Sequence, residues 1–177
     1  MIKTDRLILR RITKEDVADI HVMNSFSEVE RYNTIGIPKT IEDTVAILAK
    51  EISAGDETYN NFFSWVISLA NDNSFLGKVG MYTSTEKYQS AEIHYSLHPD
   101  HWGNGYALEA VKAVIKWGFS DLHLHRIEAG VATQNLKSIK LLEAAGMTRE
   151  GLCRQILPIR REWLDNYQYA ILASDLK

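Results

Sequence analysis

The segment that decides the fold reads Tyr95-Ser96-Leu97-His98-Pro99-Asp100-His101-Trp102-Gly103-Asn104-Gly105-Tyr106-Ala107. A strand is expected to end before Pro99, because proline cannot donate to a sheet. Two glycines then stand directly before an amphipathic helix, where they let the main chain turn tightly and approach a ligand. The free N–H groups of a first helical turn, together with the helix dipole, suit an anion such as phosphate.

The Gly103-x-Gly105 pair differs from two common phosphate-binding loops. No lysine follows Gly105, which excludes a P-loop, and only two of the three glycines of the dinucleotide fingerprint are present. A tight turn that holds no ligand is the alternative reading of this pair taken alone.

A second helix start lies further along the chain, at Asn135-Leu136-Lys137-Ser138. Asn135 suits the N-cap position, and Ser138 follows it by three residues. An alternating strand at 125–133 precedes this helix, so the order strand–helix–strand–helix predicts a right-handed crossover and a parallel pair. Both helix starts then lie at one sheet edge, where ligands usually bind. Simple capping by Asn135 and Ser138 is the alternative.

The flanking segments predict antiparallel strands and further helices. The expected strands are 6–12, 62–70, 75–83, 91–98 and 125–133, followed by a hairpin of 147–157 with 162–173. The expected helices run from Thr13 to about residue 25, from Thr40 to Gly55, over 105–119, and over 135–145. The apolar side of the helix that begins at Thr40 is expected to be Val45, Ile47, Leu48 and Ile52. We find no linker or repeat, so residues 1–177 are expected to form one domain.

Composition excludes several classes of protein. The chain has 177 residues with 20 basic and 23 acidic side chains, a net charge of −3 that argues against broad nucleic-acid affinity. The single cysteine, Cys153, excludes a disulfide framework and a cysteine zinc cluster, and no metal is expected. No apolar run approaches the roughly 20 residues of a membrane span. Charges at Lys3, Asp5 and Arg6 interrupt any signal peptide, so a cytoplasmic location is expected.

The final third of the chain carries four arginines, Arg149, Arg154, Arg160 and Arg161. A solvated face of the last hairpin is one interpretation of them. A docking patch for an acidic partner is the other.

Several motifs, taken in order, resemble the GCN5-related N-acetyltransferase (GNAT) family, in particular its ribosomal-protein-alanine N-acetyltransferase branch. These motifs are Arg6-Leu7-Ile8-Leu9-Arg10, Ala91-Glu92-Ile93-His94-Tyr95, Trp102-Gly103-Asn104-Gly105-Tyr106-Ala107-Leu108-Glu109-Ala110, Asn135-x-x-Ser138-x-x-Leu141-Leu142-x-x-x-Gly146-Met147 and Trp163-x-Asp165. The resemblance extends from about Arg6 to Leu176. It implies one α/β domain with a mixed, mostly antiparallel sheet, helices on both faces, and a parallel pair that splays at the cofactor site.

The resemblance also implies acetyl-CoA as the acetyl donor. Its pyrophosphate would lie on the main chain of Trp102, Gly103, Asn104, Gly105, Tyr106 and Ala107. Its pantetheine arm would pair near Leu97 and His98, beside Asn135 and Ser138. Asp100 stands where the family has glutamine or arginine, and an acid near a pyrophosphate is unfavourable unless it turns away.

Acetyl transfer needs a neutral amine, a polarised thioester and a proton for the thiolate. A main-chain N–H at Leu97 or His98 suits the developing oxyanion. Glu92 and His94 lie two apart on one strand and face the same way. The resemblance implies Glu92 as base, often through water, and Ser138 as acid; His94 has a suitable ordinary pKa of about 6.5. Glu92 as a paired strand carboxylate and His94 as a sheet histidine are the alternatives.

The acceptor site is expected between the N-terminal helices and the last hairpin. Tyr32, Trp65, Tyr82, Tyr95 and Trp163 either line this site or pack in the core. The leading expectation is an enzyme that acetylates a protein N-terminal α-amine. A small amine, polyamine or antibiotic acceptor, and a non-catalytic CoA-binding module, are the alternatives. A homodimer is compatible with the pattern.

Overall fold

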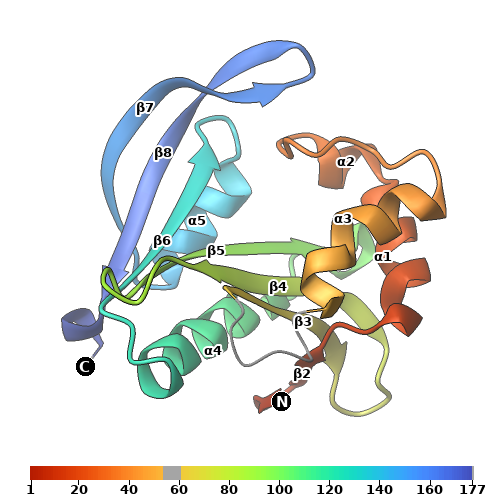
Figure 1. Cartoon of the computed structure of the whole chain (residues 1–177), viewed down its shortest axis with the longest axis horizontal. Helices are drawn as coiled ribbons and strands as arrows, with labels where there is room; N and C mark the ends of the chain where they lie inside the picture. Colours follow the sequence, from red (N-terminus) through yellow and green to blue (C-terminus); the bar gives the residue numbers. More distant parts are fainter. Residues whose placement is uncertain (54–60, 177) are drawn as a thin grey trace.

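The computed structural model describes residues 1–53 and 61–176, and these form an eight-stranded sheet of order β1-β2-β3-β4-β5-β6-β8-β7 (Figure 1). The strands are β1 (Ile2–Lys3), β2 (Leu7–Arg11), β3 (Phe62–Leu69), β4 (Phe75–Thr83), β5 (Ser90–Leu97), β6 (Arg126–Ala132), β7 (Thr148–Ile159) and β8 (Glu162–Leu172). The helices are α1 (Val17–Asn24), α2 (Ser27–Glu30), α3 (Ile41–Ser53), α4 (Tyr106–Asp121) and α5 (Leu136–Ala144). No helix within the described ranges is long and apolar enough to cross a membrane.

The only parallel contact in the described sheet is short and ends in a fork. Strands β5 and β6 pair at Ser90↔Arg126, Ala91↔Ile127 and Glu92↔Glu128. Beyond Glu92, β5 continues along β4 as far as Leu97↔Gly77, whereas β6 continues along β8. Figure 1 shows the two strands diverging from this point. The expected splayed parallel pair is therefore confirmed.

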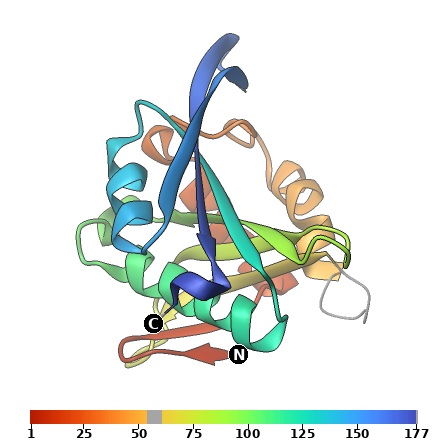
Figure 2. The same ribbon diagram turned by 90° about the vertical axis from the view of Figure 1, so that its left-hand side faces the viewer.

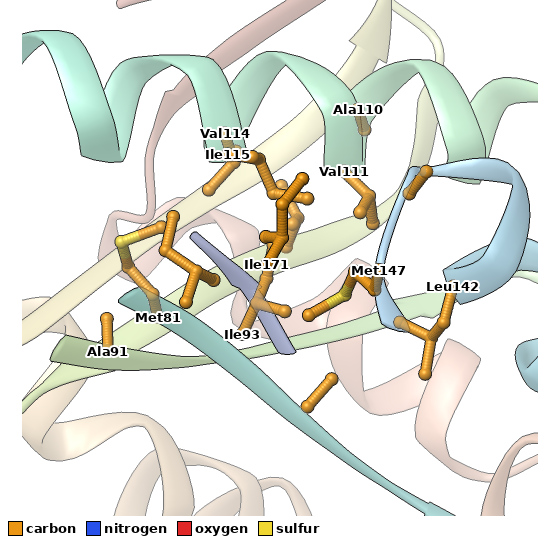
Figure 3. Packing of buried hydrophobic residues seen from close by; sticks show 14 of the residues in the cluster. Met81, Ala91, Ile93, Ala110, Val111, Val114, Ile115, Leu142, Met147 and Ile171 are labelled. Carbon is orange, nitrogen blue, oxygen red and sulfur yellow. The ribbon is translucent and has the colours of Figure 1, made fainter. Parts of the chain in front are cut away.

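Helices cover both faces of the sheet, as expected. On one face, α4 and α5 bury Val111, Val114, Ile115 and Leu142 against the strands (Figure 3). The sequence predicts an apolar stripe on α4 at Leu108, Val111, Val114, Ile115 and Gly118; the last four are buried, and Leu108 is only partly buried. On β6, Ile127, Ala129 and Val131 alternate inward as predicted. This face forms the larger core.

The other face carries α1, α2 and α3. A smaller core forms there from Val17, Ile20, Met23, Leu48 and Val66. The predicted apolar side of α3 is wrong at Val45, which is 46% exposed. Thr44 and Glu51 are buried instead, because polar partners satisfy them: Thr44 Oγ1 lies 2.7 Å from His21 Nδ1, and Lys78 Nζ donates to Glu51 at 3.1 Å. A partner of either kind removes the penalty of burying a polar group.

The predicted element order is confirmed, with local differences. The sequence analysis missed β1, α2 and the 3₁₀ turn Pro99–His101. The final hairpin closes later than expected, through a two-residue turn in which Arg160 and Arg161 have φ of +52° and +67°. Hairpins favour this twist, but glycine or asparagine normally supplies it. Gly55, the expected end of the second helix, lies outside the described residues.

Candidate active site

The glycine turn before α4 has the conformation that its sequence predicts. Gly103 and Gly105 adopt φ of +81° and +79°, in the left-handed region. A Cβ placed on Gly103 would meet no atom within 4 Å, so the turn is open on that side. The first helical bond of α4 runs from Glu109 N–H to the Gly105 carbonyl, which leaves the preceding N–H groups of the first turn without intrahelical acceptors. These donors suit a phosphate.

Trp102 was expected to bind the pyrophosphate through its main chain, but it has a different role. Its main-chain N–H already donates to the Pro99 carbonyl at 3.1 Å, so it is not free for a phosphate. Its indole N–H donates to the Leu97 carbonyl at 2.9 Å. Trp102 therefore ties the turn to the end of β5.

The side chain of Arg6, just before β2, contacts the glycine turn and stabilises it. Arg6 donates to the Asn104 carbonyl at 3.0 Å and through Nε to Glu109 at 2.7 Å. Its guanidinium also stacks over the Tyr106 ring, 4.7 Å from the centroid. An open depression beside the turn is lined by residues that include Arg6, Gly105, Glu109 and Lys112. Arg6 thus holds the turn in shape and places positive charge beside it.

The start of α5 lies next to the glycine turn. Asn135 is the N-cap, and its side chain accepts from the Ser138 N–H at 3.2 Å, as predicted. Lys137 Nζ lies 4.2 Å from the centroid of the Trp102 ring, a cation–π contact between the two helix starts. Asp100 turns away from the turn: its side chain is 79% exposed and lies 3.7 Å from His98 Nδ1. Its charge is thereby kept in solvent.

The main chain of β5 at the fork distinguishes Leu97 from His98. The His98 N–H donates to the Leu76 carbonyl of β4 at 2.8 Å. Hydrogen-bonded and non-hydrogen-bonded pairs alternate along antiparallel strands, so the main-chain groups of Leu97 point away from β4, toward the side of β6. Of the two expected oxyanion donors, only the Leu97 N–H is aimed into the fork.

Tyr95 and Ser138 meet on the α4–α5 face of the fork. Burial raises the pKa of the Tyr95 phenol to about 12, and the nearby Ser138 hydroxyl has a smaller, opposite effect on it. The phenol therefore stays protonated at neutral pH and is able to donate a proton. Tyr95 was grouped with the acceptor aromatics in the sequence analysis, and its contact with Ser138 was missed.

Two carboxylates stand side by side on the opposite face, at the vertex of the fork. Glu92 and Glu128 are register partners in the parallel pair. Burial, and secondly the charge of Glu128, raise the pKa of Glu92. Arg126 holds Glu128 through Nε at 2.6 Å and Glu150 through Nη1 at 2.9 Å. Arg126 thus pairs with two carboxylates while Glu92 adds a third beside Glu128, so the acidic side chains of this site outnumber the basic one.

His94 shares the face of Glu92 but lies in a different environment. Its ring stacks on Tyr82 with centroids 4.4 Å apart, and a Cβ on Gly80 would approach its Nε2 to 2.6 Å. Among the described residues neither ring nitrogen of His94 has a hydrogen-bond partner. Burial, and secondly the charge of Lys78, lower its pKa to about 3. Such an imidazole is neutral at pH 7 and a poor proton acceptor, which leaves Glu92 as the better candidate base.

Comparison with known proteins identifies the family to which this chain belongs. The family model described as "Acetyltransferase (GNAT) domain" matches residues 6–148. The chain belongs to the GNAT acetyltransferase family. It is 34% identical to the uncharacterized N-acetyltransferase YoaA of Bacillus subtilis, over 97% of this chain and 96% of that one. A GNAT acetyltransferase structure from Bacillus anthracis superposes with a TM-score of 0.84 at 32% identity, covering 97% of both chains.

Two relatives of this GNAT enzyme have named substrates. The spermidine N(1)-acetyltransferase of Vibrio cholerae is 26% identical over 96% of this chain and 94% of its own. The [ribosomal protein uS5]-alanine N-acetyltransferase of Escherichia coli is 30% identical, but over 50% of this chain and 45% of its own. The resemblance to the ribosomal-protein branch is therefore partial, whereas the GNAT fold and N-acetyltransferase class extend over the whole domain.

GNAT enzymes use acetyl-CoA, and the described residues fit it. The open donors of the glycine turn suit the diphosphate, and the edge of β5 at Leu97 suits an extended amide arm. Arg6 and Lys137 add positive charge that sequence reasoning missed, since neither position follows a phosphate motif. The Arg6-Leu7-Ile8-Leu9-Arg10 motif was the available signal for Arg6.

The five aromatic residues considered for the acceptor site separate into different environments. Trp65 is 2% exposed and packs edge-on against Trp117 in the larger core. Trp163 is 62% exposed on the last hairpin. Only Tyr82 lies beside Glu92 and His94, through cross-strand pairing and stacking. Trp65 is therefore a core residue.

Proposed function

We propose that this GNAT enzyme acetylates a primary amine carried by a polycationic acceptor of the polyamine type, with Glu92 as the base. The negative site at the vertex of the fork carries the proposal. Glu92 and Glu128 stand side by side there, and Arg126 neutralises only part of the charge of Glu128 and Glu150. An acceptor with more than one ammonium group gains attraction from such a site.

Each residue at the fork has one part in the reaction. Glu92 takes a proton from the acceptor ammonium, directly or through water, and the neutral nitrogen attacks the acetyl carbon. The Leu97 N–H stabilises the oxyanion that forms. As the carbon–sulfur bond breaks, Ser138, which lies near the Tyr95 phenol, donates a proton to the thiolate; the nitrogen loses its second proton to water, and water returns a proton to Ser138. The products are the N-acetylated amine and free CoA.

The relatives include acetyltransferases of both a polyamine and a ribosomal protein, so the charge of the site, rather than the relatives, carries the choice of a polyamine acceptor. The spermidine acetyltransferase matches 96% of the chain at 26% identity, the uS5-alanine enzyme matches 50% at 30%, and the full-length relatives of higher identity have no named substrate. A protein N-terminal α-amine is the second candidate, because its pKa of about 7.7–8.0 leaves part of it neutral without a base.

An acceptor panel tests the proposal. CoA release would be followed with acetyl-CoA and each of spermidine, butylamine and an alanine-initiated peptide. We expect kcat/KM for spermidine to exceed that for butylamine by at least about tenfold, because the additional charges of spermidine are attracted to the negative site. A tenfold ratio corresponds to a difference of only about 1.4 kcal/mol in binding free energy. Glu92→Gln should lower kcat/KM for spermidine by about 100-fold, the size of general-base catalysis.

Glu86→Gln is the matched control, since Glu86 is an exposed carboxylate in the β4–β5 connection. This variant should behave as wild type. If the enzyme prefers the alanine peptide and Glu92→Gln has little effect on the rate, the polyamine proposal is wrong and the acceptor is a protein N-terminal α-amine. Binding of CoA without turnover of any amine would make the domain a non-catalytic module.

A further inference from the structure

The tip of the last hairpin is joined to the N-terminal helices by one ion pair. Arg160, in the β7–β8 turn, donates to Glu30 Oε2 through Nε at 3.1 Å and through Nη2 at 2.5 Å. Glu30 ends the short helix α2 and is 8% exposed although it is charged. A buried carboxylate is stabilised only when it is paired in this way. Figure 2 shows how far this hairpin projects from the sheet.

The two partners belong to opposite arms of the fork. On one arm, Phe26 at the start of α2 packs edge-on against His98, at the end of β5, with ring centroids 4.7 Å apart. On the other arm, β8 pairs with β6 only as far as Ala132↔Asn166, and the hairpin continues beyond that point. The contact between Glu30 and Arg160 therefore bridges the diverging strands beyond their last shared residues.

The bridge also lies on the acceptor face. Helices α1 to α3 cover the face that carries Glu92 and His94, and Glu30 belongs to this group of helices. An amine bound over Glu92 on this face would lie in the fork whose two arms carry α2 and the hairpin. The spacing of these two elements then decides how well the acceptor is held.

We propose that the Glu30–Arg160 pair is a positioning clasp that sets the spacing of the two arms and thereby determines acceptor affinity. This inference rests on the proposed function, because it needs an acceptor that binds over Glu92. The clasp touches no reacting atom. Its loss should therefore raise KM for the acceptor and leave kcat nearly unchanged.

Kinetics of three hairpin variants test the clasp. Arg160→Gln should raise the spermidine KM about tenfold, as expected for loss of a charge-assisted hydrogen-bonded pair, with kcat within about twofold. The dissociation constant for CoA should not change, because the glycine turn is held by Arg6 and Trp102 instead. Arg160→Lys keeps the charge and should recover much of the acceptor affinity.

Arg161→Gln is the matched control, because Arg161 shares the turn and its positive φ but forms no ion pair within the described residues. This variant should keep the wild-type KM. Equal KM values for Arg160→Gln and Arg161→Gln would overturn the clasp. A lowered kcat with an unchanged KM would also contradict it.

Limited trypsin digestion provides a measurement that does not depend on turnover. In Glu30→Gln the cleavage sites at Arg160 and Arg161 are intact, but the hairpin tip is released. Cleavage there should accelerate about tenfold over wild type, while Glu28→Gln, a change of an exposed carboxylate two residues earlier on α2, should not accelerate it. If the wild type acetylates no amine, the proposed function fails while this digestion still tests the clasp. Unchanged cleavage in Glu30→Gln would overturn the clasp whatever the kinetics show.

Discussion

At the scale of single residues, the neighbour of Glu92 matters as much as Glu92 itself. Burial, and secondly Glu128, raise the pKa of Glu92, and the base must be ionised to act. Activity should therefore rise with pH through this pKa. Glu128→Gln removes the second cause, so the acidic limb of the profile of kcat/KM against pH should move to lower pH.

The measurement is kcat/KM for spermidine between pH 4.5 and 8 in wild type and Glu128→Gln. Glu162→Gln, an exposed carboxylate near the hairpin tip, is the control and should leave the limb in place. If the acidic limb of the pH profile lies at the same pH in Glu128→Gln as in wild type, or at a higher pH, Glu92 does not titrate in catalysis. Glu128→Gln should also show a smaller preference for spermidine over butylamine, because this variant removes one carboxylate of the negative site.

At the scale of elements, the turn between β5 and α4 depends on backbone conformation rather than on space. Gly103 and Gly151 both have room for a Cβ, with no atom within 4 Å, but only Gly103 has a positive φ, +81°. Gly103→Ala should therefore destabilise the fold by about 1–2 kcal/mol, the cost of a left-handed L-residue. It should also weaken CoA binding, because the N–H groups that follow it would be displaced.

The comparison of Gly103→Ala with Gly151→Ala isolates this effect. CoA affinity by calorimetry and midpoints of urea unfolding should change in the first variant and not in the second. Equal CoA affinity in Gly103→Ala and wild type would show that the turn does not hold the diphosphate.

At the scale of the whole molecule, His94 couples folding to pH. Its pKa is about 3 in the folded chain, below the roughly 6.5 of an unfolded histidine, so the unfolded state binds more protons between these values. Stability should consequently fall as pH drops below about 6.5, by up to about 1.4 kcal/mol per unit from this one group. Above pH 6.5 both states are neutral here, and the contribution is constant.

The free energy of unfolding from urea titrations at pH 7 and pH 4.5 measures this coupling. His94→Phe keeps a ring against Tyr82 but removes the proton site, so it should lose about 2–3 kcal/mol less than wild type over this interval. His123→Phe is the control for an exposed histidine at a helix end. Parallel pH profiles for wild type and His94→Phe would show that the ring is not buried as neutral imidazole.

The sequence by itself determined the order of the elements and the backbone conformation at the two helix starts. Alternation at Ile127, Ala129 and Val131, the capping residue Asn135 and the two glycines each act within a few residues, so local pattern was enough to place them. The parallel pair followed from the order of these elements, whereas its splay was implied by the motifs that resemble the GNAT family. The 3₁₀ turn Pro99–His101 was missed because it spans only three residues, and the hairpin turn at Arg160 was missed because it lacks the usual glycine or asparagine.

Only the tertiary structure decided which distant side chains meet. Strand register places Glu128 beside Glu92, and the crossover brings Ser138 to Tyr95, although each pair is more than 30 residues apart. The pairing of Arg160 with Glu30 spans 130 positions and depends on the path of the hairpin past the end of β6. Burial likewise separates His94 from Glu92, two residues apart on one strand, because only the packing around each ring or carboxylate sets its pKa.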